Sequence, residues 1–131
     1  MDHKKIFTII GVIHIVVAIC LVVFAFNFDE LIKPYVSTEL TDEVKTLNLA
    51  QIRAAIVHSF GLGLIMYCCR SLSNASEMKN VLAAYSIFAI LLLGNAIYAE
   101  CCSTGGPPLP IFALIAVSTV LGVYGYVKGE A

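Results

Sequence analysis

Polar and ionisable side chains interrupt the long apolar stretches of this chain, and their chemistry raises the first question about function. Five of them lie within such a stretch or at its edge: His14, Arg53, His58, Asn95 and Glu100. An ionised side chain at the centre of a membrane helix costs roughly 2.5 to 3.5 kcal/mol, so each needs a partner or a path to water. We therefore take these five as candidate binding residues.

The two histidines, His14 and His58, lie deepest within their apolar stretches. A histidine in such a place can ligate a metal or a pigment, relay a proton or bond a neighbouring carbonyl group. Neither belongs to a His-x-x-x-His or Glu-x-x-His pattern, the spacings that support metal sites on helices. We expect a structural role, predict no metal site and assign no catalytic residue.

Arg53 lies near the start of the second apolar stretch, and Glu100 lies at the end of the third. If those two helices are adjacent and antiparallel, the two side chains meet at a similar depth and form a charge pair. Two other interpretations stay open: Arg53 extends to lipid headgroups, which is the one we favour, or the pair binds a substrate or is catalytic. Asn95 is expected to hydrogen-bond between helices, with ligand binding in a bundle cavity as its alternative.

The five cysteines occur as Cys20 and two vicinal pairs, Cys68-Cys69 and Cys101-Cys102. The Cys-x-x-Cys spacing of membrane thiol oxidoreductases is missing, and vicinal cysteines are poorly placed to bridge each other. Cys68 and Cys69 are candidates for reversible palmitoylation. The alternative is that they are small apolar residues at a helix end.

Four apolar segments must position these side chains. Each is about 19 to 23 residues long, and about 20 helical residues cross a hydrocarbon core. The chain is 60% hydrophobic and 13% charged, whereas soluble domains carry about 25% charged residues. Its mean hydropathy is +0.91. The net charge of −1 gives no basic footprint, so we expect a lipid bilayer and no nucleic acid as partner.

These features predict an all-α fold, a four-transmembrane-helix up-down-up-down antiparallel bundle that forms one integral membrane domain over residues 1–131. We expect the apolar run that follows Lys4 and Lys5 to be a retained first helix rather than a secretion signal, because it is too long for one. The expected helices cover residues 6–28, 42–70, 80–100 and 109–128.

Charge sorting predicts the orientation of the bundle. Five of the eight basic residues fall on the side of the two termini: Lys4, Lys5, Arg70, Lys79 and Lys128. The positive-inside rule therefore places both termini on the cytoplasmic or equivalent side. The sequon at Asn74 then never meets the glycosylation machinery.

Small residues recur at helical spacing and predict the faces on which helices pack, because close approach in lipid depends on small side chains. The fourth helix carries the clearest line. The predicted packing residues are Ser118, Gly122, Gly125, Gly129, Gly11, Ala18, Ala54 and Gly61. We expect these faces to turn inward or toward a partner subunit.

The layout resembles the DoxX-like group of small four-helix membrane proteins. The matching elements are Lys33-Pro34 after the first helix, Asn48 to Arg53 with Gly61 and Gly63 in the second, Gly94 to Glu100 at the end of the third, and the turn Gly105-Gly106-Pro107-Pro108. The chain is also similar to compact four-helix scaffolds that tether sterol-biosynthesis enzymes. Both resemblances imply a role in assembly.

We therefore expect a non-enzymatic accessory or scaffold subunit that packs against other membrane subunits or forms a homo-oligomer, with a bound lipid. Two alternatives stay open. One is a lipid- or quinone-binding redox protein that uses the cysteines and histidines, and the other is a homo-oligomeric transporter of small solutes. The sequence shows no clearly broken helix at mid-membrane, which is the usual indication of a transport site.

Overall fold

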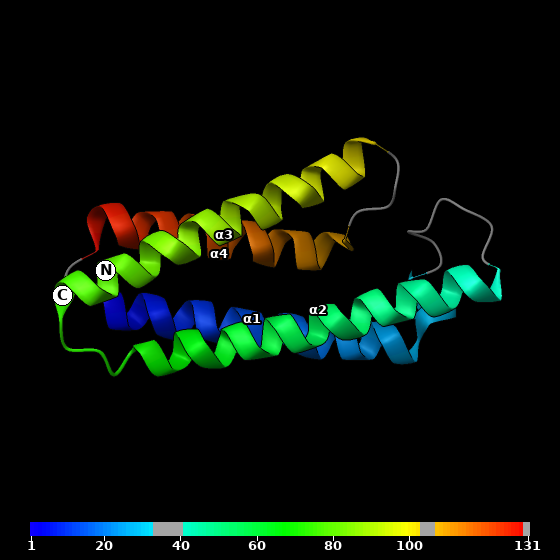
Figure 1. Cartoon of the computed structure of the whole chain (residues 1–131), viewed down its shortest axis with the longest axis horizontal. Coiled ribbons are helices and arrows are strands. Elements are labelled where there is room, and N and C mark those ends of the chain that lie inside the picture. Colours follow the sequence, from blue (N-terminus) through cyan, green and yellow to red (C-terminus); the bar gives the residue numbers. More distant parts are fainter. Residues whose placement is uncertain (33–40, 103–106, 130–131) are drawn as a thin grey trace.

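A computed structural model shows four long helices packed antiparallel (Figure 1). The structure describes residues 1–32, 41–102 and 107–129. The motifs Lys33-Pro34 and Gly105-Gly106 lie outside these ranges. The helices are α1 (His3–Phe26), η1 (Phe28–Ile32, a short π-helix), α2 (Asp42–Cys69), α3 (Ala75–Cys101) and α4 (Leu109–Lys128).

Side-chain caps explain why three helices begin where they do. The Asp2 carboxylate accepts the backbone N–H of Lys4, so α1 begins at His3, three residues before the expected start. The Asn74 side chain accepts the N–H of Ser76, so α3 begins at Ala75, five residues before its expected start. The Thr41 hydroxyl accepts the N–H of Val44 and begins α2 at Asp42, as the sequence predicts.

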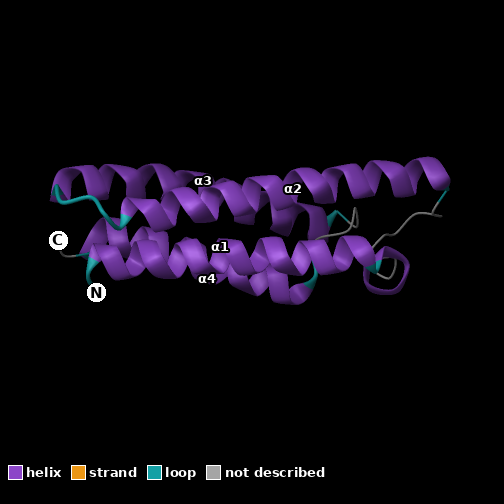
Figure 2. Cartoon of the chain, turned by 90° about the horizontal axis from the view of Figure 1, so that it is seen from below, coloured by secondary structure: helices purple, strands orange, loops and turns teal. Residues whose placement is uncertain are grey.

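The helices form two close pairs, α1 with α2 and α3 with α4, and α1 packs on α4 to join them. Figure 1 shows α2 and α3 diverging toward the end opposite the termini, and Figure 2 shows both on the same side of α1 and α4. In the described part of the chain, α2 and α3 share no extensive packing. The expectation that consecutive helices are packed neighbours thus fails for this pair, although the two remain antiparallel.

Two apolar clusters hold the bundle together. The larger one, near the termini, joins α1, α2 and α3 through Ile6, Phe7, Ile10, Met66, Met78, Leu82, Tyr85 and Ala89. The smaller one joins α1 and α4 through Val17, Ile111 and Ile115. At the opposite end, Lys45 forms an ion pair with Asp29 (2.7 Å) and lies over the Phe28 ring, which fixes the start of α2 against the end of α1.

All four long helices are long and apolar enough to cross a membrane. The shortest, α4, has 20 residues, which at 1.5 Å per residue spans about 30 Å, the thickness of a hydrocarbon core. The protein is a multi-pass integral membrane protein. Its termini lie at one end of the bundle (Figure 1), where the Met1 amine donates to the Tyr124 hydroxyl at 3.3 Å.

Candidate functional site

A buried histidine and tyrosine form the most prominent polar contact inside the bundle. His14 of α1 lies 2.8 Å, from Nε2 to the hydroxyl oxygen, from Tyr85 of α3, and the two rings meet edge to face with centroids 5.7 Å apart. Both residues are buried. The hydrogen bond therefore connects α1 directly to α3, two helices that do not follow each other in the chain.

Three buried hydroxyl groups on α3 and α4 each have a partner on their own helix. Ser118 donates to the Ile115 carbonyl at 2.9 Å, and Ser86 donates to the Leu82 carbonyl at 2.6 Å. Thr119 bonds the Ile115 carbonyl at 2.8 Å and also lies 3.3 Å from the Ala89 carbonyl of α3. The group is suited to holding helices in register.

Two buried ring nitrogens have no partner within the described ranges: Nδ1 of His14 and Nδ1 of His3. His3 is wholly buried, and its Nε2 lies 3.2 Å from the Gly125 carbonyl of α4. Each histidine thus uses one nitrogen to join α1 to another helix. Among the residues that the structure describes, no group of three His, Cys, Asp or Glu side chains could hold a metal ion.

Glycines allow the helices to approach closely at the same places. A Cβ on Gly122 would lie 2.7 Å from the Tyr85 ring, and one on Gly125 would lie 2.9 Å from Ile6. Between α1 and α2, a Cβ on Gly11 would lie 2.9 Å from the Gly63 carbonyl, and the reverse distance is the same. Neighbouring atoms occupy the space beside these glycines, so a larger residue forces the helices apart.

The other predicted packing residues are placed differently. Ser118 and Ala18 are buried, whereas Ala54 is exposed. A Cβ on Gly61 would meet nothing within 4 Å, so this glycine faces away from the rest of the chain. Gly129 follows the last residue of α4, and a Cβ there would clash with the His3 ring and the Gly125 carbonyl.

Four of the five candidate binding residues lie on exposed surface: Arg53 and His58 of α2, and Asn95 and Glu100 of α3. Within the described ranges no ion pair joins Arg53 to Glu100, because α2 and α3 diverge where these residues lie. The His58 ring bonds the Ala54 carbonyl of its own helix at 2.8 Å. The structure therefore brings none of the four against another helix of this chain.

The five cysteines are free. Cys68, Cys101 and Cys102 are exposed, whereas Cys20 and Cys69 are half-buried. Cys68 and Cys69 form the last turn of α2, next to Arg70. The two vicinal pairs lie at opposite ends of the bundle, at the end of α2 and the end of α3, so they cannot bridge each other.

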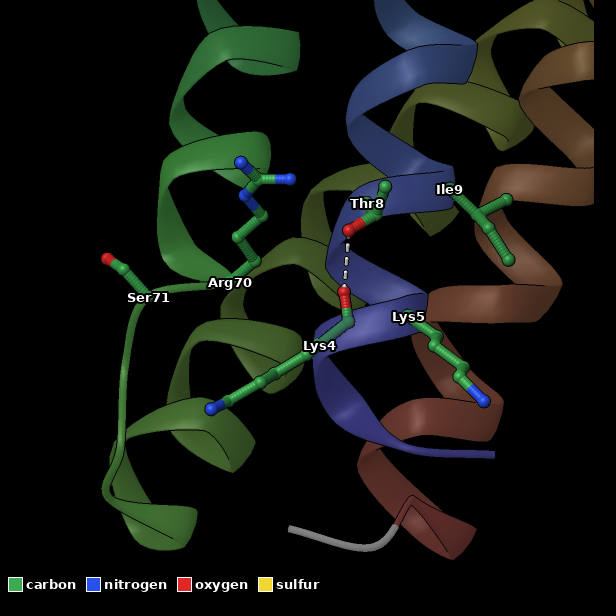
Figure 3. A pocket seen from close by; sticks show the side chains of 6 residues that line it. All are labelled: Lys4, Lys5, Thr8, Ile9, Arg70 and Ser71. Atoms are coloured by element: carbon green, nitrogen blue, oxygen red, sulfur yellow. Dashed lines mark hydrogen bonds between the residues drawn. The ribbon is translucent and has the colours of Figure 1, made fainter.

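A pocket of about 510 Å³ opens between the start of α1 and the end of α2 (Figure 3). Its lining residues are Lys4, Lys5, Thr8, Ile9, Arg70 and Ser71. Three of these carry a positive charge, and the Arg70 guanidinium lies 3.9 Å from the centre of the Tyr67 ring. The pocket lies at the end of the bundle that holds both termini.

Three residues that matter to this arrangement were not singled out from the sequence as site or packing residues: Tyr85, His3 and Gly63. The position of Tyr85 in mid-helix could have marked it in the sequence, since the other tyrosines of the helices lie near helix ends. His3 and Gly63 had no comparable signal, because a histidine before the first apolar run and a second glycine beside Gly61 fit many arrangements.

No family model, curated protein or solved structure matches the chain. The resemblance to the DoxX-like group rests on the short motifs quoted above and stays a prediction.

Proposed function

We propose that this protein is a non-enzymatic accessory subunit that binds another membrane protein through the outer face of α2. One observation carries the proposal: Arg53 and His58 lie exposed on a membrane-spanning helix, and in the described part of the chain neither bonds to another helix. A polar side chain at membrane depth costs free energy unless it is paired or reaches water. A helix of a partner protein would supply that pairing.

The burial of α2 supports this choice of face. In its most apolar window only 11% of α2 is buried inside the chain, against 33% of α1 and of α4. Val57 is 72% exposed and lies between Arg53 and His58. One turn of helix separates Ala54 from His58, and Gly61 follows, so small residues accompany the polar ones along the exposed side.

The position of Arg53 along α2 indicates which kind of side chain the partner helix offers to it. Gly63 packs on Gly11 and Ile15, near the middle of α1, and Arg53 lies ten residues before it, about 15 Å nearer the end opposite the termini. An arginine at this depth favours a carboxylate, which it can bind through two parallel hydrogen bonds. We therefore assign the partner helix an Asp or Glu facing Arg53. With both termini on the cytoplasmic side, this contact falls in the outer half of the bilayer.

Photocrosslinking in native membranes tests the assignment. p-Benzoylphenylalanine replaces Val57 on the proposed face, or Ile19, which is 58% exposed on α1, as the matched control. We expect the reagent at position 57 to crosslink the chain to a second membrane protein. The reagent at position 19 should not capture that protein. Arg53→Ala should reduce that product several-fold, because the charge pair is lost.

Native sizing after extraction in a mild detergent can contradict the proposal. A particle larger than the 14.1 kDa chain that contains a second protein supports an accessory role. A partner-free monomer, or a particle made of this chain alone, would overturn the proposal. In the second case the face of α2 joins copies of the same chain.

A further inference from the structure

We propose that the pocket between α1 and α2 binds a phosphate group, and that the phosphate belongs to the headgroup of an anionic membrane phospholipid. Lys4 borders the pocket from α1 and Arg70 borders it from the end of α2 (Figure 3), and Lys5 is the third cation among its lining residues. The hydroxyls of Thr8 and Ser71 also line it. Its volume of about 510 Å³ lies within the range of ordinary ligand sites, about 300 to 1,000 Å³.

The charge of the pocket is not neutralised by the chain itself. Within the described ranges, Lys4, Lys5 and Arg70 form no ion pair. The nearest carboxylate in sequence, Asp2, accepts the backbone N–H of Lys4 at 2.8 Å and caps α1. The Thr8 and Ser71 hydroxyls donate to the Lys4 and Cys68 carbonyls, so their protons are already engaged within the chain. The cations therefore carry the recognition.

The arginine is held ready for a planar, bidentate contact. Its guanidinium group lies over the Tyr67 ring, which limits its motion without using its N–H donors. Figure 3 shows Lys4 extending on the side of α1 that faces α2, with its amine directed away from the Arg70 guanidinium, while Lys5 extends from the other side of α1. A phosphate held by the donor fork of Arg70 would gain a point charge from the other helix when the flexible Lys4 side chain turns toward it.

The place of the pocket in the membrane favours a lipid over a free anion. It lies where α1 begins and α2 ends, which is the level of headgroups for helices of this length. Ile9, 38% exposed, borders the pocket one turn farther along α1 and offers an apolar surface to an acyl chain. Basic pockets between transmembrane helices on the cytoplasmic side are the usual sites for anionic headgroups.

Native mass spectrometry of the full chain in a mild detergent tests the assignment by lipid titration. The probes are phosphatidylglycerol, phosphatidylcholine with the same acyl chains, and inorganic phosphate. We expect phosphatidylglycerol to bind about tenfold more tightly than phosphatidylcholine, and the double variant Lys4→Ala with Arg70→Ala to lose about tenfold in affinity for it. Inorganic phosphate should not displace it.

A matched double variant removes two cations from the same end of the bundle but outside the pocket, Lys79→Ala with Lys128→Ala. We expect its affinity to stay within about twofold of the unmodified chain. Equal losses in both double variants would overturn the site in favour of general surface charge. Competition by inorganic phosphate, or equal binding of the two lipids, would overturn the lipid assignment.

Folding of the variants is checked by circular dichroism and size-exclusion chromatography. If the double variant does not fold, the single variants Lys4→Gln and Arg70→Lys decide the matter. Each should weaken phosphatidylglycerol binding several-fold, the second because lysine lacks the two-pronged geometry of arginine. Unchanged binding in both would overturn the proposal.

Discussion

At the scale of single residues, the bundle depends on a few polar contacts that lipid cannot replace. His14 and Tyr85 are 71 positions apart in sequence and yet form a buried hydrogen bond of 2.8 Å. Interhelical hydrogen bonds in membrane proteins contribute about 0.6 kcal/mol on average, up to about 1.7. Breaking this bond leaves Nε2 of His14 buried without a hydrogen-bond partner, and Nδ1 of the same ring already has none in the described part of the chain. An unsatisfied buried group adds its own desolvation cost to the loss of the bond.

Replacement of Tyr85 by phenylalanine removes the hydroxyl and keeps the ring that fills the space against Gly122. We expect the free energy of unfolding in detergent to fall by about 1 kcal/mol, measured by denaturant titration. Tyr98→Phe is the control, since that side chain is 67% exposed, and it should change little.

A double-mutant cycle with His14→Phe separates the hydrogen bond from packing. If the two residues interact as the geometry indicates, each substitution costs less in the presence of the other than it does alone. Strict additivity of the two effects would contradict the coupling.

At the scale of helices, the sequence predicts which segments are helical better than it predicts which of them touch. Each apolar run is long enough to span a membrane, and local caps such as Thr41 set the boundaries. The pairing of α1 with α4 and the separation of α2 from α3 depend on how side chains fit across helices. The sequence predicts Arg53 and Glu100 to be partners only if those two helices pack together.

Gly61 and Gly63 illustrate the limit, because both fit a small-residue motif on one helix. A Cβ on Gly63 would lie 2.9 Å from the Gly11 carbonyl, whereas one on Gly61 would meet nothing within 4 Å. Spacing alone does not distinguish the glycine that contacts α1 from the glycine that faces outward. The candidate residues for binding are likewise recognisable by type, but their exposure follows from the tertiary arrangement.

Alanine substitution at these two glycines should have opposite effects on stability. We expect Gly63→Ala to destabilise the chain by about 1 to 3 kcal/mol, because the new methyl group presses against backbone atoms of α1 that cannot move independently. Gly61→Ala should leave stability unchanged or raise it by up to about 1 kcal/mol, because alanine favours helix. Unfolding of both variants in the same detergent measures the difference, and similar losses would contradict the α1–α2 contact.

At the scale of the whole molecule, charge distribution and function are linked through orientation. The end with the termini carries Lys4, Lys5, Arg70 and the phosphate pocket proposed above, while Asp29, Glu30, Asp42, Glu43 and Glu100 lie at the opposite end. Cytoplasmic leaflets are the anionic ones, so the basic pocket meets its proposed ligand if the termini face the cytoplasm. The positive-inside rule and the proposed lipid site therefore require the same orientation.

Native cysteines allow that orientation to be measured without new reporter sites. Two variants each retain one exposed cysteine, Cys68 near the termini or Cys101 at the opposite end, with the others changed to serine. A membrane-impermeant maleimide added to intact cells should label the Cys101 variant and not the Cys68 variant. After permeabilisation both should react, which shows that each thiol is accessible. Labelling of Cys68 alone in intact cells would show the opposite orientation. The basic pocket would then face the leaflet with little anionic lipid.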